Sequence, residues 1–382
     1  MDNLISMKKT FWKSLLYTLP MALILIVFIT QGQLSFSNIS QSLAVLTTFL
    51  FMVFLYFMMH YTGKTDRFRA ILFISFAVAL SFAFIKNMLE VRNSISISGA
   101  DFLECRIPFC HLVIPMMIIP AALTKSIIFP GSIVSGFANI STMVVLWFVA
   151  TLALGRGFCS WGCFYGGWDD GFSRIGKKPI IKKINEIWKW MPFAVLLLVA
   201  ITAALSLSPT YCEWMCPFKA VTEYEKVTSV ESAAKAAVFL SLFFGLVIIL
   251  PVLTKKRTQC SFLCPLGAVN SLSNKINPFT IKIDKAVCTD CMKCVKTCPM
   301  FALTDDGVKK GEVSMLCSKC GKCVDTCTKQ AIHYGIKGVP TGTKKKLSRN
   351  IFLFVSFLFM AVFSAGSIAT LLQSMFSLFL GK

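Results

Sequence analysis

Two runs of cysteine are the residues of this sequence with the clearest chemical potential. They read CTDCMKCVKTCP from Cys288 and CSKCGKCVDTCT from Cys317, and each has the spacing C-x2-C-x2-C-x3-C. Thiolates at this spacing, given twice, are typical of a bacterial domain that holds two [4Fe–4S] clusters, in which the fourth cysteine of each run binds the other run's cluster. The spacing therefore predicts two ligand sets: Cys288, Cys291, Cys294 and Cys327 for one cluster, and Cys317, Cys320, Cys323 and Cys298 for the other.

The segment that carries these runs is expected to be an α+β ferredoxin domain over 278–338, inserted into a different kind of chain. Residues 280–336 interrupt a long hydrophobic pattern. The alternative is a zinc module or a redox-active thiol cluster, which the match at all eight cysteines disfavours. Pro299 follows the first run, whereas Thr328 stands at the corresponding place after the second, a departure that removes no ligand.

The other eight cysteines of the sixteen form four close pairs. The pairs are Cys105/Cys110, Cys159/Cys163, Cys212/Cys216 and Cys260/Cys264, and the last three share the spacing C-x3-C. Residues i and i+4 lie on one face of a helix, so each C-x3-C pair can present two thiols together. These eight residues are therefore the candidate metal ligands outside the ferredoxin domain.

The elements that position these pairs are expected to be membrane-spanning helices. Of the 382 residues, 55% are hydrophobic and only 15% are charged, and the mean hydropathy is +0.70, whereas a soluble domain carries about 25% charged residues. Seven stretches are long and apolar enough to span a bilayer: 14–30, 43–59, 70–86, 132–154, 191–208, 237–254 and 351–380. We therefore predict an all-α polytopic membrane domain over 1–277, and a linker with a C-terminal transmembrane helix over 339–382.

An eighth apolar stretch, 107–123, is expected to be re-entrant. It contains Pro108, Pro115 and Pro120. If it does not cross, the predicted inside segments before the ferredoxin domain hold sixteen Lys and Arg residues and the outside segments seven. The positive-inside rule favours this arrangement, which places the ferredoxin domain on the cytoplasmic side of a bacterial inner membrane. The same placement explains the net charge of +21 without nucleic acid as a partner.

The motifs together resemble a known family. GRGFCSWGCFYG at 155–166, KRTQCSFLCPLG at 256–267 and the ferredoxin runs at 288–327 are similar to the membrane polyferredoxins, which include the NapH, NosR and CcoG proteins. The resemblance covers roughly 130–335. It implies a protein of the cytoplasmic membrane that relays electrons. The pairs Cys105/Cys110 and Cys212/Cys216 go beyond the two C-x3-C motifs that the resemblance accounts for.

The predicted topology sorts the four pairs by side of the membrane. Cys159/Cys163 and Cys260/Cys264 follow spans that end inside, and Cys105/Cys110 and Cys212/Cys216 fall on outside segments. Four thiolates suffice for one [4Fe–4S] cluster, so the hypothesis is one further cluster at each face, giving four clusters in a wire across the membrane. The two faces are about 30 Å apart, which requires either re-entrant segments that bring the clusters inward or a quinone or partner cofactor between them.

Three other roles for the pairs remain open. Buried cysteine behaves as a small apolar residue, outer pairs can form disulfides as dithiol relays do, and paired thiols can hold Cu(I). The expected function is iron–sulfur electron transfer between cytoplasmic-side or quinone donors and a membrane or extracytoplasmic redox partner. The alternatives are a copper-handling or cupric-reducing assembly factor of the CcoG type and a membrane redox sensor. The sequence contains neither GxGxxG nor a P-loop, so no nucleotide is expected as a ligand.

Overall fold

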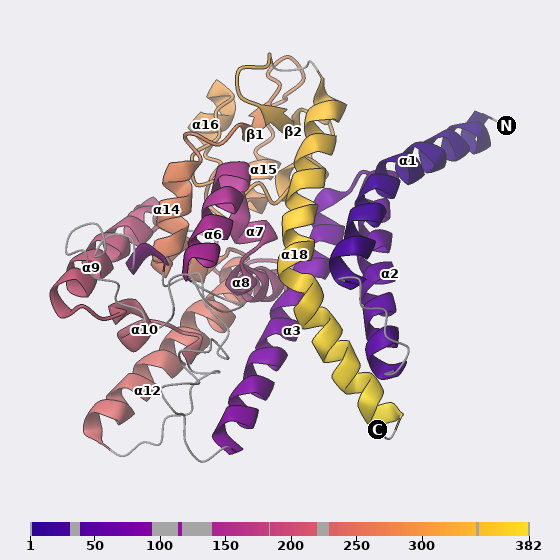
Figure 1. Cartoon of the computed structure of the whole chain (residues 1–382). Coiled ribbons are helices and arrows are strands. Elements are labelled where there is room, and N and C mark those ends of the chain that lie inside the picture. Colours follow the sequence, from indigo (N-terminus) through magenta and orange to yellow (C-terminus); the bar gives the residue numbers. More distant parts are fainter. Residues whose placement is uncertain are drawn as a thin grey trace.

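The computed structural model describes residues 2–30, 39–93, 114–116, 140–182, 184–219, 229–340 and 344–380. Long helices form one end of the molecule, and a small domain with two short strands forms the other (Figure 1). The pair Cys105/Cys110, and most of the predicted re-entrant segment 107–123, lie outside the described residues.

Seven apolar helices are the main elements outside the small domain, as the hydropathy predicts. They are α1 (Asp2–Thr30), α2 (Ile39–Thr62), α3 (Thr65–Asn93), α6 (Ile140–Leu154), α9 (Met191–Ser206), α12 (Val230–Leu242) and α18 (Lys345–Phe379). Six stretches of described residues are long and apolar enough to cross a membrane: Thr10–Thr30, Ile39–Thr62, Val144–Trp161, Ile187–Ser206, Val230–Thr254 and Lys345–Phe379. The seventh predicted span, 70–86, lies within α3. The helical, membrane-type character is thus confirmed, while the number of crossings stays a prediction.

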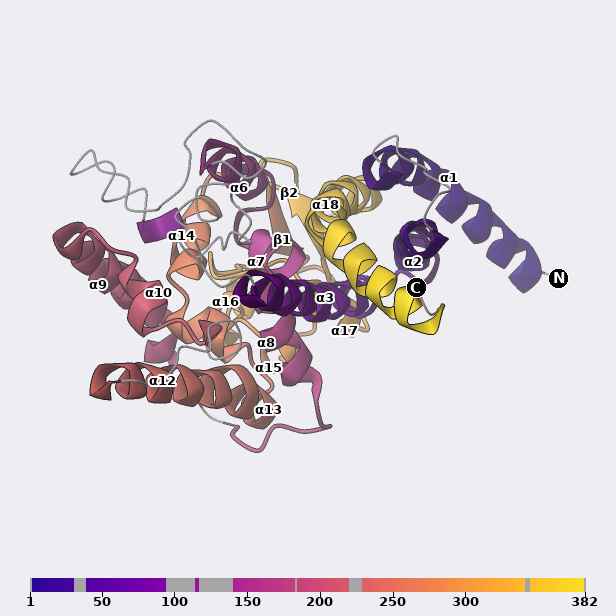
Figure 2. The same cartoon turned by 60° about the horizontal axis from the view of Figure 1, so that its bottom comes forward.

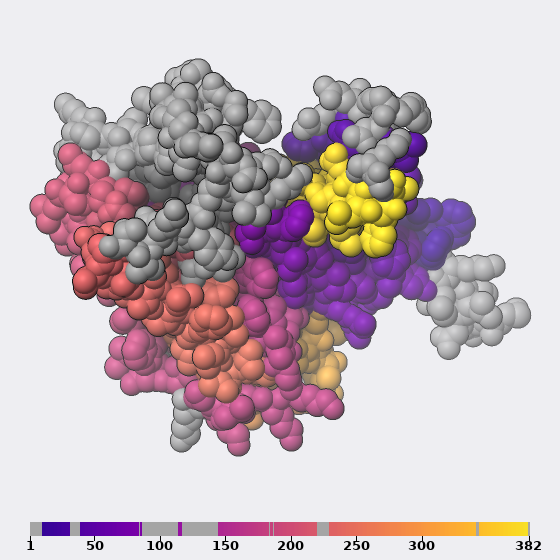
Figure 3. Space-filling view, turned by 90° about the horizontal axis from the view of Figure 1, so that it is seen from below, coloured from indigo at the N-terminus to yellow at the C-terminus, as the bar shows by residue number. Residues whose placement is uncertain are grey.

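Helices α1, α2, α3 and α18 pack side by side (Figures 1 and 2). The buried residues of α2 recur at helical spacing, for example Ala44, Thr48, Met52 and Tyr56, because only one stripe of the helix faces its neighbours. The 35 residues of α18 reach about 50 Å at 1.5 Å per residue, more than the roughly 30 Å hydrocarbon core. This helix therefore connects the small domain to the far end of α2 and α3, and Figure 3 shows that end from below.

Three successive segments each place a C-x3-C pair just after a span. The first runs from α6 through η2 (Gly155–Gly157) and α7 (Phe158–Trp161) to α8 (Phe164–Arg174). The second runs from η3 (Glu186–Trp190) through α9 to α10 (Thr210–Trp214). The third runs from α12 through η4 (Phe243–Ile249), α13 (Leu250–Thr254) and η5 (Gln259–Leu263) to α14 (Pro265–Ser273). Three segments of the chain thus each combine a long apolar helix with a C-x3-C pair and a short helix.

The third span contains a π-helical stretch, η4, immediately before Pro251. Proline lacks an amide hydrogen and its ring clashes with the carbonyl four residues earlier, so a wider turn relieves the conflict. The Leu246 carbonyl within η4 accepts a hydrogen bond from the Thr258 hydroxyl instead. This bond ties the span to the turn that carries Cys260.

The small domain is closed by an antiparallel pair of strands, β1 (Phe279–Ile283) and β2 (Ile332–Ile336), with Phe279 opposite Ile336. Between them lie the two cysteine runs and the short helices α15 (Lys293–Thr297), α16 (Asp305–Lys310) and α17 (Lys322–Thr326). The strands hold the first and last residues of the segment together. All eight cysteines of the two runs therefore lie within one closed unit.

Candidate metal centres

The two cysteine runs fold in the same way. In each run the residues just before and just after the second cysteine have left-handed backbone: Asp290 and Met292 in the first, Lys319 and Gly321 in the second, with φ of 47°, 55°, 51° and 89°. Non-glycine residues adopt such angles only where the surroundings impose them. Alternation of right- and left-handed residues makes concave nests of amide hydrogens that favour an anion.

The first run encloses a cavity with the fourth cysteine of the second run. Cys288, Cys291, Cys294 and Cys327 all line it, together with Met292, Lys293 and Lys329. These four cysteines are the predicted first ligand set. The structure brings them together, and their assignment as ligands is carried forward as a proposal.

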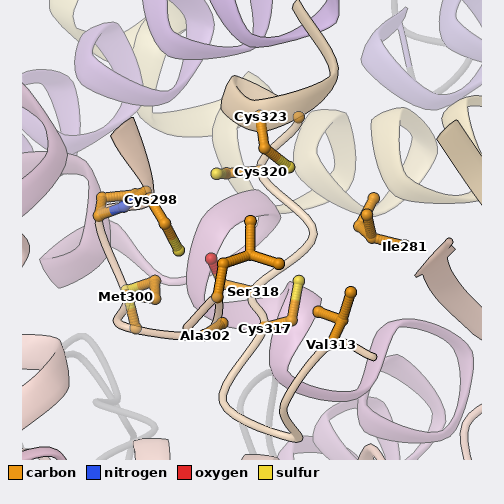
Figure 4. Close-up of a pocket in the computed structure, with 12 residues that line it drawn as sticks. Ile281, Cys298, Met300, Ala302, Val313, Cys317, Ser318, Cys320 and Cys323 are labelled. Carbon is orange, nitrogen blue, oxygen red and sulfur yellow. The ribbon is translucent and has the colours of Figure 1, made fainter. Parts of the chain in front are cut away.

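The second run encloses a matching cavity. Cys317, Cys320, Cys323 and Cys298 line it, and their sulfur atoms face a common space (Figure 4). The Ser318 hydroxyl is buried at this cavity and has no hydrogen-bond partner within the described part of the chain. An unpaired buried hydroxyl is costly, so it fits a site whose occupant accepts a hydrogen bond.

The pairs Cys159/Cys163 and Cys260/Cys264 converge in the membrane domain. All four side chains are buried. Burial raises the pKa of the Cys264 thiol well above its usual value, and the neighbouring Cys159 and Cys163 raise it further. Burial also raises the pKa of Cys260 well above its usual value, and the neighbouring Asp169 and then the other three thiols raise it further. Thiols that resist ionisation alone become stable thiolates when they bind a metal. We call these four residues the membrane quartet.

Each C-x3-C turn directs amide hydrogens at the sulfur of its second cysteine. Cys264 is the N-cap of α14, and its Sγ accepts a hydrogen bond from the Gly267 amide at 3.4 Å. Cys163 is the N-cap of α8, and amide hydrogens of Tyr165 and Gly166 lower its pKa against the larger effect of burial, which raises it to about 12. Helix N-termini favour negative charge. The turns therefore suit an anionic, thiolate-ligated group.

A glycine in each of these two turns lets the backbone pack against the carbonyl of the first cysteine of the pair. A Cβ on Gly166 would lie 2.1 Å from the Cys159 carbonyl oxygen, and one on Gly267 would lie 3.0 Å from the Cys260 carbonyl oxygen. Both glycines stand three residues after the second cysteine of their pair. The longer pattern C-x3-C-x2-G was therefore a signal in the sequence that the two pairs share one local fold.

A buried cation lies beside the membrane quartet. Arg156 is 1% exposed, and its Nη2 donates to the Cys260 carbonyl at 3.2 Å. Its Nε and Nη1 have no hydrogen-bond partner among the described residues. Because an unpaired buried charge is strongly unfavourable, the guanidinium fits a site whose occupant is an anion, as a thiolate-bound iron–sulfur cluster is.

The membrane quartet lies next to the second-run cavity. Arg156 interacts electrostatically with Cys159, Cys260 and Cys264 of the quartet and also with Cys317 of the second run. Lys319, whose pKa burial lowers to about 7, likewise interacts with both Cys317 and Cys159. The Arg156 amide and Lys319 Nζ both donate to Asn274 Oδ1, at 3.0 and 2.6 Å, and Asn274 Nδ2 donates to the Cys317 carbonyl at 2.9 Å.

The pair Cys212/Cys216 lies on the other side of the quartet. The Cys216 Sγ and the Tyr165 hydroxyl are 2.8 Å apart, and Tyr165 follows Cys163 by two residues. Tyr211 accepts a hydrogen bond from Gln259, the neighbour of Cys260, at 3.1 Å. The pair predicted for the outer face therefore approaches the quartet through a few side chains. Its predicted companions, Cys105 and Cys110, lie outside the described residues.

A buried ion-pair network was not foreseen from the sequence. Asp170 pairs with Arg69 at 2.7 Å and with Arg257 at 2.8 Å, and all three side chains are 0% exposed. Arg257 also donates to Ser160, and Arg69 donates to the Cys320 carbonyl. These arginines had been counted only as charges that orient the spans. The adjacent acids Asp169 and Asp170 in an apolar chain were the signal that such cations have buried partners.

The arrangement suits [4Fe–4S] clusters. Within the described ranges, no three Cys, His, Asp or Glu side chains are close enough together to hold one metal ion. Ligands of a [4Fe–4S] cluster are held apart because each binds a different iron atom of a larger body. The cavities, the amide donors and the unpaired guanidinium all fit such a group.

Comparison with known proteins gives the same chemistry. A 4Fe-4S dicluster domain matches residues 280–328. A second domain family, described as a 4Fe-4S binding domain, matches residues 136–183, 188–226 and 236–283. Each of these three segments contains one C-x3-C pair, including Cys212/Cys216, which the resemblance had left unexplained. The predicted cofactor class, [4Fe–4S] clusters, is thereby confirmed.

Several curated proteins are similar over part of their length. The putative electron transport protein YccM of Escherichia coli (strain K12) is 26% identical over 176 residues, which are 44% of this chain and 48% of YccM. The methylamine utilization ferredoxin-type protein MauN of Methylobacillus flagellatus is 25% identical over 173 residues, 45% of this chain and 58% of MauN. The ferredoxin-type protein NapH of Haemophilus influenzae is 25% identical over 161 residues, 42% of this chain and 53% of NapH. The alignments thus span about half the length of these relatives, and no solved structure matches the chain.

Proposed function

We propose that this NapH-like polyferredoxin relays electrons between its ferredoxin domain and the interior of the membrane through a row of cysteine sites. The resemblance to ferredoxin-type electron-transport proteins is confirmed by the relatives and the domain matches. The chain is accordingly an iron–sulfur electron-transfer protein with membrane-type helices. The route, the number of clusters and the partners are the proposal.

The observation that carries the route is the continuity of the thiol sites. Arg156 Nη2 donates to the Cys260 carbonyl of the membrane quartet, the Arg156 amide donates to Asn274, and Asn274 donates to the Cys317 carbonyl of the second-run cavity. On the quartet's own turn, the Tyr165 hydroxyl contacts Cys216 Sγ. The sequence alone implied roughly 30 Å between an inner and an outer site. These contacts support the alternative in which re-entrant segments bring the cluster sites toward the middle of the membrane.

The residues of the row have separable tasks. The two ferredoxin cavities and the membrane quartet each supply four thiols, and Cys212 and Cys216 supply two toward a fourth site that Cys105 and Cys110 would complete. When bound, each [4Fe–4S] cluster would accept and release one electron at a time. The buried arginines and the helix N-termini stabilise the negative charge of the ligated thiolates. Burial of the quartet excludes water from it.

The proposed orientation places the ferredoxin domain on the cytoplasmic side of a bacterial inner membrane. Its support is the excess of basic residues on the predicted inside segments. In this orientation the ferredoxin domain exchanges electrons with a soluble or quinone donor, and the Cys212/Cys216 site faces a membrane or extracytoplasmic partner. The copper-handling and sensor functions would use the same thiols, and the metal content of the purified protein separates copper handling from the relay.

The test is the iron, sulfide and copper content of anaerobically purified protein. Four clusters correspond to about sixteen iron atoms per chain. Replacing both Cys212 and Cys216 by serine should remove about four of them and leave the ferredoxin signals unchanged. A matched control is replacement of Ser206 and Ser208 by alanine in the same segment, which should leave iron unchanged. Copper in place of iron, or an unchanged iron content in the cysteine variant, would contradict the four-cluster relay.

A further inference from the structure

The ferredoxin domain turns its second-run cavity toward the membrane domain. Trp161 Nε1 donates to the Lys319 carbonyl at 3.2 Å, Arg69 Nε donates to the Cys320 carbonyl at 3.1 Å, and Asn274 Nδ2 donates to the Cys317 carbonyl at 2.9 Å. All three donors belong to the membrane domain. The backbone around this cavity is therefore covered, and a soluble partner has no access from that side.

The first-run cavity has the opposite surroundings. Cys291 is exposed, and no other cysteine in the described part of the chain is. Cys288 and Cys327 are half-buried, and the neighbouring Val287 is 43% exposed. Electrons that arrive from a soluble donor meet the row at this cavity, because its ligands come closest to the surface.

The rim of this cavity is basic. Lys293 and Lys329 line it and are exposed. Lys285 also lies at this rim, where its Nζ donates to Asp290 at 2.7 Å and to the carbonyl of Val308, a residue that lines the cavity. Among the described residues Lys293 and Lys329 have no carboxylate partner. The rim thus carries three lysines and one aspartate.

We propose that this basic rim is the docking surface of a small acidic one-electron carrier protein, such as an acidic ferredoxin or flavodoxin. The inference rests on the proposed relay function, and it identifies the soluble partner of the relay by that partner's negative surface charge. In the exchange the carrier loses one electron, and the [4Fe–4S] cluster held by the first-run cavity gains it. The exposed Val287 and Cys291 supply the short apolar contact, and the lysines supply long-range attraction.

Charge complementarity of this kind acts mainly on the rate of association. Steered encounters reach about 10⁸–10⁹ M⁻¹s⁻¹ at low salt, against about 10⁵–10⁶ M⁻¹s⁻¹ for uncharged surfaces. Attraction between exposed charges falls as the Debye length shortens, from about 30 Å at 0.01 M to about 8 Å at 0.15 M. The rate of electron transfer from an acidic carrier should therefore fall steeply with salt.

The experiment uses the full-length protein in nanodiscs of neutral lipid and a reduced acidic [2Fe–2S] ferredoxin as the probe. The variant is K293E/K329E, and stopped-flow absorbance follows oxidation of the probe. We expect the second-order rate at low salt to fall about tenfold or more, and its dependence on salt to flatten. A basic cytochrome, used as an acceptor from the dithionite-reduced protein, should react faster with the same variant.

The matched control makes the same change in charge elsewhere. K178E/K275E reverses two exposed lysines of the membrane domain, and we expect its rates to stay within about twofold of the native protein, because its charges lie beyond the contact. Equal losses in both variants, or an unchanged rate in the rim variant, would overturn the docking site. Failure of the relay is separate: it would appear as missing iron and missing dithionite-reducible signals in the native protein.

Discussion

Replacing Arg156 by methionine should lower the reduction potentials of two neighbouring sites at once. The guanidinium interacts with thiols of the membrane quartet and of the second-run cavity. An added electron makes a cluster more negative, so a nearby buried cation favours the reduced state. Removing that cation should therefore lower both reduction potentials, while the reduction potential of the first-run site stays unchanged.

The magnitude follows from Coulomb's law. A unit charge about 7 Å from the centre of a site, at an effective dielectric constant of about 20, contributes about 2.4 kcal/mol. For a one-electron couple this corresponds to about 100 mV, since 59 mV is a tenfold change in the equilibrium constant. The side chain is a clean probe, because within the described residues it makes one hydrogen bond, to the Cys260 carbonyl.

The assay is a redox titration of the full-length protein, followed by low-temperature electron paramagnetic resonance. Arg156→Lys is the matched control, because it keeps the positive charge and should leave both reduction potentials close to those of the native protein. A fall of less than about 20 mV in Arg156→Met, or an equal fall in Arg156→Lys, would refute the electrostatic role. The same result would also argue against clusters near Arg156 at both the membrane quartet and the second-run cavity.

Three further changes test other parts of the site. Tyr165→Phe removes the hydroxyl beside Cys216 and should lower the potential of that site by about 40 mV, the equivalent of one hydrogen bond of about 1 kcal/mol; unchanged potentials in a redox titration would mean that Cys216 is not a ligand. Cys298→Ser should remove about four iron atoms and the spectrum of the second-run site, since this residue lines that cavity; loss of the first-run spectrum instead would reverse the ligand assignment. Asp170→Asn leaves Arg257 without its carboxylate partner among the described residues and Arg69 with Asp66 alone; it should lower the free energy of unfolding by about 3–5 kcal/mol, seen as a lower melting temperature and faster proteolysis, whereas an unchanged melting curve would show that the network does not stabilise the fold.

The sequence by itself was sufficient for the chemistry that depends on local spacing. Three thiols with two residues between each and the next specify a cluster-binding turn, so the runs from Cys288 and Cys317 predict iron–sulfur clusters without knowledge of the fold. Uninterrupted apolar stretches likewise predicted most of the long helices, because a span is a local property of composition and length. The two C-x3-C-x2-G turns also share their local structure for a reason visible in the sequence.

The tertiary structure decided what those local turns face. Arg69 and Arg257 stand at the ends of apolar segments, where their sequence context is that of topology signals, yet the fold buries both against Asp170. Cys216 was predicted at the far side of the membrane from Cys163, and the fold places it against Tyr165, two residues from Cys163. These contacts join residues 51 to 101 positions apart. The local sequence does not predict them, because they depend on how whole helices pack. The arrangement of the cysteine sites relative to one another therefore depends on tertiary packing and could not be predicted from the sequence.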